Sequence, residues 1–272
     1  MKGSFSVLTP DVTVEYKLDS SVREDSGNCH DEFEILYICD GFGKYIVEGS
    51  EYKITPRTLL VIRPLEYHSL ILEPKSSYER YSIRFSKSAL SGESLHMLDE
   101  IMGGDGESGN YYPTGSVTVP IASVFDRLET AELLPDAERC AYIKALLCEL
   151  IILLSAASGE KMIHTEDELG ARVIRYLNTN INKNISLDKL ARRFFVSKYY
   201  LCRAFKQHNG TSVHSYINRK RIMYAKQLIE AGETASRAAY SVGFGDYSAF
   251  YRAYVKVIGR SPTAEVARKE TV

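Results

Sequence analysis

The chain has 272 residues, which is enough for about two domains. Its apolar fraction of 44% and charged fraction of 25% are ordinary for a globular protein. The net charge of −1 hides an uneven distribution, because residues 165–272 carry 19 Lys or Arg and 9 Asp or Glu, a net of +10, against −11 upstream. This asymmetry predicts that the basic half meets a polyanion, and charge drift on solvated surfaces is the alternative.

The cysteines and the apolar segments exclude several classes of protein. The five cysteines include no C-x-x-C pair, which argues against a zinc ribbon or a redox motif and favours reduced thiols. The N-terminus lacks the apolar core of a signal peptide. The most apolar stretch, residues 143–157, contains Lys144 and Glu149 and is shorter than a membrane span. We therefore expect a soluble, cytoplasmic protein.

Residues 1–120 have the pattern of a β domain. Short apolar or alternating runs occur at residues 34–39, 44–47, 59–62, 69–72 and 81–85. Turn-forming pairs such as Asp40-Gly41 and Arg63-Pro64 separate them, which predicts a β-sandwich or small barrel. The glycine-rich segment 103–110 is expected to be a loop.

Helical periodicity begins near Ile121 and resumes after Pro135, where apolar residues recur at three- and four-residue steps as far as Leu154. The second of these helices is apolar on more than one face, so it is buried in the core or against another subunit. The sequence leaves both open. We expect residues 121–160 to form a helical dimerisation and linker region.

The basic half, residues 165–272, is helical throughout. Thr165 to Glu168 has the form of a capping box. Helix-capping residues follow at Ser186, Ser197, Ser212, Thr234 and Asp246, and helix-ending glycines at Gly210, Gly232 and Gly259. This order predicts a short helix followed by a longer one, twice, at about 187–208 and 235–258.

Each of these two pairs fits a helix-turn-helix unit. Ala191 in the first pair, and Ala239 and Gly243 in the second, are small enough for the close approach of two crossed helices. The second helix of such a unit enters the major groove of DNA. An ordinary bundle with solvated basic faces is the alternative, and two units in tandem argue against it.

The outward faces of the second helices supply the expected DNA-binding residues. They are Lys198, Tyr199, Cys202, Arg203 and Lys206 in the first unit, and Tyr247, Ser248, Tyr251 and Arg252 in the second. Arg203 and Arg252 are expected to read bases, because a guanidinium bonds guanine in bidentate fashion. Phosphate contacts are expected from Lys198, Lys206, Arg219, Lys220 and Arg221.

Three segments resemble the AraC/XylS family of transcription regulators. They are ISLDKLA at 185–191, VSKYYLCRAFK at 196–206 and VGFGDYSAFYR at 242–252, followed by Ser261-Pro262. The resemblance implies that two recognition helices occupy successive major-groove segments. Ala235 and Ala238 stand where the family has larger aliphatic residues, and Tyr254-Val255 replaces Phe-Lys. We therefore expect a looser core in the second unit and a dominant role for the first.

The resemblance also implies an N-terminal small-molecule sensor of the cupin type. Asn28, His30, Glu34 and His68 resemble the cupin pattern H-x-H-x-x-x-E…H, with Asn28 in place of the first histidine. Alternation along a strand would put His30, Glu32 and Glu34 on one face. We take His30, Glu32, Glu34 and His68 as candidate effector-binding residues. A polar ligand such as a sugar, a metal ion, and purely structural histidines all remain open.

Together these patterns predict an α+β chain: a cupin-like β-barrel over residues 1–120, helices of a dimerising type over 121–160, and a DNA-binding domain over 165–272. The leading hypothesis is a sequence-specific transcription regulator with no catalytic residues and no cofactor. Its expected partners are double-stranded DNA, a small polar effector, a second copy of the chain and RNA polymerase. The alternatives are a metal-dependent cupin enzyme with a DNA-binding tail, and a regulator that needs no effector.

Overall fold

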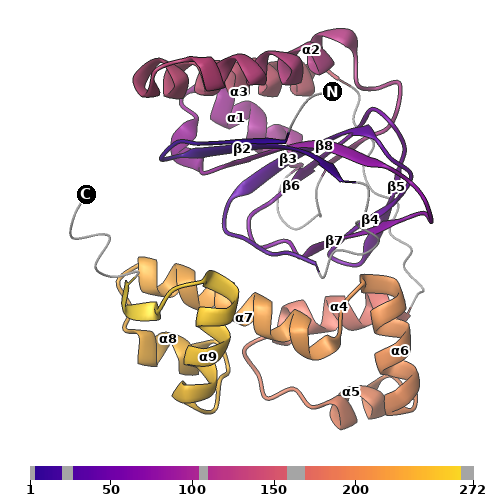
Figure 1. The fold of residues 1–272 in the computed structure, drawn as a ribbon. Coiled ribbons are helices and arrows are strands. Elements are labelled where there is room, and N and C mark those ends of the chain that lie inside the picture. The colour runs from indigo at the N-terminus through magenta and orange to yellow at the C-terminus, as the bar shows by residue number, and fades with distance from the viewer. Residues whose placement is uncertain (1–3, 20–26, 104–109, 158–168, 265–272) are drawn as a thin grey trace. The chain divides into compact units, whose positions relative to one another are not determined.

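The computed structural model describes residues 4–19, 27–103, 110–157 and 169–264. The expected capping box at Thr165 and most of the expected loop at 103–110 lie outside these ranges. The chain divides into two compact units, which we call the β unit and the helical unit (Figure 1). Met1–Asp25, Glu32–Glu66 and Leu70–His164 form the β unit, and Ser26–Asp31, Tyr67–Ser69 and Thr165–Val272 form the helical unit.

Two sheets of different size form a β-sandwich. The larger has the order β1-β2-β8-β3-β6-β9 and the smaller the order β5-β4-β7. Their bounds are β1 Phe5–Leu8, β2 Val12–Asp19, β3 Phe33–Asp40, β4 Gly43–Val47, β5 Ser50–Ile54, β6 Thr58–Ile62, β7 His68–Leu72, β8 Tyr78–Phe85 and β9 Asn110–Tyr112. The apolar runs at 44–47 and 59–62 lie in strands β4 and β6, and the other runs predicted from the sequence are strands as well.

Alternate residues of the central strand β3 serve two different cores. Ile35 and Tyr37 pack with the helices of the β unit, in one continuous cluster of buried residues. Leu36 and Ile38 face the other way and pack with the smaller sheet. Because both faces of β3 are covered, its sequence is a continuous apolar run and not an apolar–polar alternation.

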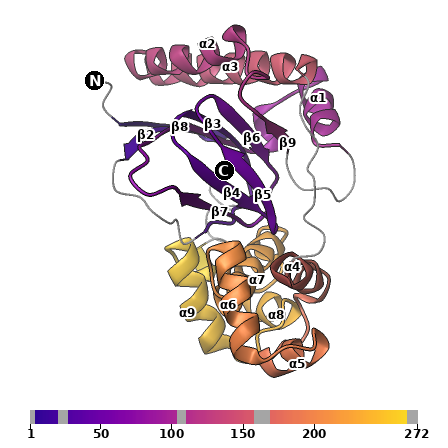
Figure 2. The same ribbon diagram turned by 90° about the vertical axis from the view of Figure 1, so that its right-hand side faces the viewer.

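Helices cover the outer face of the larger sheet (Figures 1 and 2). They are η1 Lys87–Ala89, α1 Glu93–Ile101, α2 Val119–Arg127, η2 Leu128–Leu133 and α3 Asp136–Ala156. Helix α1 lies within residues 1–120, where the sequence pattern predicts strands, so the prediction is wrong for this segment. Within the described residues, no helix is both long and apolar enough to cross a membrane. The predicted α+β class is confirmed.

The helical unit contains α4 Leu169–Asn180, α5 Leu187–Arg193, α6 Lys198–Asn209, α7 Val213–Glu230, α8 Ala235–Ser241 and α9 Tyr247–Ile258. All five predicted capping side chains accept a backbone N–H three residues on, which satisfies a donor that has no partner inside the helix: Ser186, Ser197, Ser212, Thr234 and Asp246. Gly210 and Gly259 end α6 and α9 with left-handed φ values of 68° and 82°.

The turns of the two helix-turn-helix units are closed by the same pair of hydrogen bonds. After α5, Phe195 N–H donates to the Arg192 carbonyl and Val196 N–H to the Ala191 carbonyl. After α8, Gly243 N–H donates to Tyr240 and Phe244 N–H to Ala239 in the same pattern. This is the Schellman motif, whose left-handed residue is Phe195 in the first unit and Gly243 in the second.

Candidate DNA-binding surface and effector site

Helix α6 presents most of its predicted DNA-binding side chains to solvent. Lys198, Tyr199, Arg203 and Lys206 are exposed, and Cys202 is half-buried. The opposite face of the helix carries Leu201 and Phe205, which are completely buried, so packing fixes which side faces outward.

One of these cations already has a partner in the protein. The Lys198 Nζ atom lies 2.8 Å from a carboxylate oxygen of Asp188 on α5. The hydrogen bond from Lys198 holds the pKa of the Asp188 carboxyl below its ordinary value. Lys198 therefore reaches a phosphate only in competition with Asp188.

Helix α9 is similar, with one difference. Ser248, Tyr251 and Arg252 are exposed, as predicted. Tyr247 is half-buried, and its ring centroid lies 5.7 Å from that of Phe250 in the core of the second unit. Tyr247 therefore contributes to packing as well as to the surface.

Two residues of α7 do not match the phosphate contacts expected of them. Lys220 is only 4% exposed and its Nζ lies about 6 Å from the ring centroids of Tyr216 and Tyr224. Arg221 donates from Nε to the Ile181 carbonyl (2.8 Å) and from Nη2 to the Lys183 carbonyl (2.6 Å). Burial lowers the pKa of Arg221. The expectation is wrong for both, because this part of α7 packs inward.

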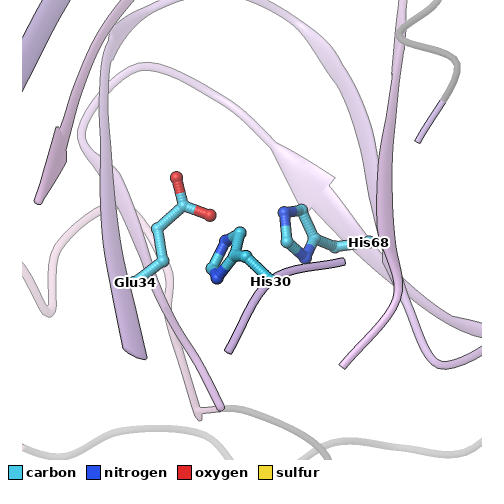
Figure 3. Close-up of side chains that lie close together, drawn as sticks. All are labelled: His30, Glu34 and His68. Atoms are coloured by element: carbon cyan, nitrogen blue, oxygen red, sulfur yellow. The ribbon is translucent and has the colours of Figure 1, made fainter. Parts of the chain in front are cut away.

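A second group of functional candidates lies at the start of β3 and β7. His30, Glu34 and His68 are all buried, and one ligand atom from each lies within 4.8 Å of the others (Figure 3). The two imidazole rings meet edge to face with centroids 5.0 Å apart. The structure thus brings together three of the four candidate effector-binding residues, all except Glu32.

Strand geometry explains which residues join this cluster. Glu34 lies on the same face of β3 as Leu36, toward the space between the sheets. His68 begins β7, and its backbone exchanges two hydrogen bonds with Asn28 (2.7 and 2.9 Å). Glu32 is absent from the cluster and lies 3.8 Å from Arg84 instead. The prediction that Glu32 shares a strand face with His30 and Glu34 is wrong, because β3 begins only at Phe33 and strand alternation does not extend back to Glu32.

Further polar groups surround Glu34. The Ser82 hydroxyl donates to the Glu34 carboxylate over 2.5 Å. Burial disfavours the charged form of Arg80, but Tyr78, Tyr45 and Glu34 outweigh it and raise the pKa of the guanidinium. Neither Ser82 nor Arg80 is predicted from the sequence, because only the pairing of β8 with β3 brings them here.

The donor set of the cluster fits a metal ion as well as a polar ligand. Two imidazole nitrogens and one carboxylate oxygen are a combination that iron, manganese and zinc accept in proteins. His30, Glu34 and His68 would hold such an ion, and the ion would supply a Lewis acid that orients an oxygen-bearing ligand.

Two family models match this chain. The model described as an AraC-like ligand binding domain matches residues 24–147, and a helix-turn-helix domain model matches residues 190–268. The first model contains His30, Glu34 and His68, and the second contains α6 and α9. The chain is an AraC-family transcription regulator with a ligand-binding domain.

Curated relatives of this AraC-family regulator agree with that assignment. The HTH-type transcriptional activators RhaS of Salmonella schwarzengrund (strain CVM19633) and Salmonella typhimurium (strain LT2) are each 25% identical over 239 residues, covering 86% of this chain and 84% of theirs. Among solved structures, ToxT from Vibrio cholerae O395 aligns over 95% of this chain and 98% of its own, with 14% identity and a TM-score of 0.42. The DNA-binding domain of AdpA, in complex with a target DNA, covers 39% of this regulator and 96% of its own chain, with 22% identity and a TM-score of 0.37.

Proposed function

We propose that this regulator is controlled by a small polar effector, with sugars as the favoured class, bound at the cluster of His30, Glu34 and His68. The observation that carries the proposal is a set of buried polar groups in an otherwise apolar interior. Glu34 supplies acceptors and Arg80 supplies donors, which is the mixture that a polyhydroxylated ligand requires. The three-residue cluster also lies in a segment matched by the ligand-binding model.

The effector acts by binding one conformation of the regulator better than another, since a ligand shifts an equilibrium only through differential affinity. A panel of neutral and acidic monosaccharides tests the proposal by thermal unfolding and isothermal titration calorimetry. We expect at least one sugar to raise the unfolding temperature. Glu34→Gln removes the response, whereas the control Glu100→Gln, an exposed carboxylate on α1, keeps it. No response to any sugar contradicts the sugar assignment.

A metal ion is the second candidate occupant, because the same three side chains form a complete two-histidine, one-carboxylate set. Titration of chelator-treated protein with Mn²⁺, Fe²⁺ or Zn²⁺ distinguishes a metal ion from a sugar as the occupant. Stoichiometric binding that His68→Asn abolishes, together with no sugar response, favours the metal. His96 is exposed on α1 and provides the matched control His96→Asn.

We also propose that the regulator is a homodimer that pairs through α3. Helix α3 buries Leu147 and Leu150 in the core of the β unit but leaves Ala141, Ala145 and Ile152 exposed on another side. Exposed apolar residues on one helix mark protein contacts when they are contiguous. Sedimentation equilibrium should give a dimer for the unmodified protein and a monomer for Ala145→Arg. A monomeric unmodified protein, or a dimeric Ala145→Arg variant, contradicts this interface.

Finally, we propose that α6 and α9 read the operator, with Tyr199 and Arg203 as the dominant contacts, and that the bound regulator contacts RNA polymerase. The exposure of these side chains and the matched helix-turn-helix model support this assignment. Selection of duplexes from a random library by the purified protein, followed by quantitative gel shifts, tests it. Enrichment of no sequence would contradict it.

A further inference from the structure

Phe195 combines an unfavourable backbone with an exposed side chain. Its φ is +57°, a left-handed value that costs free energy for any residue with a Cβ and is usually taken by Gly or Asn. Among the described residues from 169 to 264, no other non-glycine residue has a positive φ. Phe195 is also 94% exposed, so burial of its ring does not compensate for the strain.

Strain of this kind is characteristic of functional positions, where a side chain is kept for what it contacts outside the fold. In the second unit the equivalent position is Gly243, which has the residue type that the backbone favours. The backbone of the Schellman motif therefore does not explain why the first unit carries phenylalanine.

The surroundings of Phe195 indicate the partner. It lies two residues before Ser197, the residue that caps α6, and Tyr199 and Tyr200 in the first turn of α6 are 77% and 56% exposed. We call Phe195, Tyr199 and Tyr200 the aromatic tip. The N-terminal end of a recognition helix is the part that contacts base edges in the major groove.

The charge around the aromatic tip favours DNA over a protein partner. Residues 186–210 contain six Lys or Arg and a single Asp. The cores of protein–protein interfaces are depleted in charged residues, whereas cationic surfaces gain affinity for DNA by displacing its counterions.

We propose that Phe195 contacts duplex DNA and reads thymine, through apolar contact between its ring and the 5-methyl group in the major groove. Phenylalanine is among the side chains that make this contact, and it distinguishes thymine from the other bases without a hydrogen bond. The inference rests on DNA binding by the first helix-turn-helix unit. It adds the turn before the recognition helix to the surface that reads sequence.

Phe195→Asn tests the proposal with the full-length protein and a duplex selected from a random library by the unmodified protein. Asparagine accepts the left-handed backbone, so the unfolding temperature should stay the same or rise. We expect the affinity for the selected duplex to fall about tenfold, with an unchanged slope of affinity against salt because no charge is removed. Phe42→Asn, at an exposed phenylalanine of the β unit, is the matched control and should leave affinity unchanged.

A second duplex carries deoxyuridine in place of each thymine, which removes only the 5-methyl groups. The unmodified protein should bind this duplex more weakly than the thymine duplex. Phe195→Asn should lose less binding free energy on the same change of duplex, and the difference between the two losses should equal the cost of the substitution on the thymine duplex. Equal losses for both proteins overturn thymine reading.

The proposal is overturned if Phe195→Asn binds the thymine duplex with an affinity within twofold of that of the unmodified protein. If transcription activation with RNA polymerase nevertheless falls, Phe195 contacts a protein and not DNA. If the unmodified protein selects no duplex, the proposed DNA reading by the regulator itself is contradicted. If it selects a duplex that Phe195→Asn binds equally well, only the proposal for Phe195 is contradicted.

Discussion

The two helix-turn-helix units have the same backbone conformation in their turns and differ in the residue at the left-handed position of the turn. Both close the first helix with the same two hydrogen bonds. A Cβ on Gly243 would lie 2.6 Å from the Asn182 carbonyl oxygen and 2.9 Å from Arg221, so packing as well as φ requires glycine there. Phe195 at the equivalent position extends into solvent. In the second unit the turn residue serves the fold, and in the first it is available to a partner.

The cores of the two units also differ from the sequence-based expectation. Small residues at Ala235 and Ala238 led us to expect a looser second unit. In the structure Ala238, Ala239, Phe250 and Tyr254 are all completely buried in one cluster. The Arg221 guanidinium also lies 5.8 Å from the Phe244 ring centroid. The described residues thus give the second unit a closed core, and any weaker DNA contact has to arise at its surface.

The largest effect is expected for Gly243→Ala. The left-handed φ of 93° and the approach to Asn182 should together cost about 2–4 kcal/mol of unfolding free energy. Gly259→Ala, with a φ of 82° and open space around it, is the control and should cost only about 1 kcal/mol. Urea unfolding measures both. Equal costs would show that the approach to Asn182 is not what requires glycine.

Removing the two arginines compares the units directly at the DNA. Arg203→Ala should cost about 1–3 kcal/mol of binding free energy at a selected duplex and relax base preference there, and Arg252→Ala should cost less. Arg237→Ala, an exposed arginine on α8 outside the recognition helices, serves as the control. A larger loss for Arg252→Ala than for Arg203→Ala in a gel shift would reverse the ranking of the units.

The helix caps should show that the units are equal in local stability. Ser197 accepts from Tyr200 N–H (3.2 Å) and Asp246 from Ala249 N–H (2.8 Å). Ser197→Ala and Asp246→Ala should each cost about 1 kcal/mol in thermal or urea unfolding, and Ser197→Asp and Asp246→Ser should restore most of it. A cost at only one of the two sites would show that the caps are not equivalent.

The smallest effect concerns Asp188, which holds Lys198 of the first recognition helix. Asp188→Asn frees Lys198 for phosphate and should raise DNA affinity about twofold at low salt, with the gain lost as salt screens it. Because the hydrogen bond from Lys198 holds the pKa of the Asp188 carboxyl below its ordinary value, this carboxylate stays charged to a lower pH than a free aspartate, and protonation mimics the variant only below that pH. Unchanged affinity at low salt would show that Asp188 does not compete with DNA.

The sequence predicted best what depends on neighbours in the chain. The caps at Ser197 and Asp246 are bonds to residues three positions on, so their residue types were sufficient. The cluster of His30, Glu34 and His68 was found through a family resemblance, since periodicity alone does not place His68 beside β3. These local and motif-based signals account for the caps and for the proximity of the three side chains that the structure shows.

The misses have a common cause, which is contact between residues far apart in sequence. Ser82 reaches Glu34 only because β8 pairs with β3. Lys220 and Arg221 look like a basic surface in sequence, but α7 buries Lys220, and backbone carbonyls of Ile181 and Lys183 accept from Arg221. Glu32 was misplaced because the start of a strand is set by its partners and not by alternation.

The order of strands in the larger sheet also bears on how the chain acquires its fold. Strand β8 lies between β2 and β3, so Tyr16 pairs with Tyr81, a residue 65 positions further along the chain. Contacts so distant in sequence close slowly, whereas the caps and turns of the helical unit form from residues a few positions apart. During synthesis, β2 can pair with β1 and β3 with β6 early, but β2 and β3 join one sheet only after β8 has left the ribosome. Each helix-turn-helix unit has its local partners as soon as it emerges.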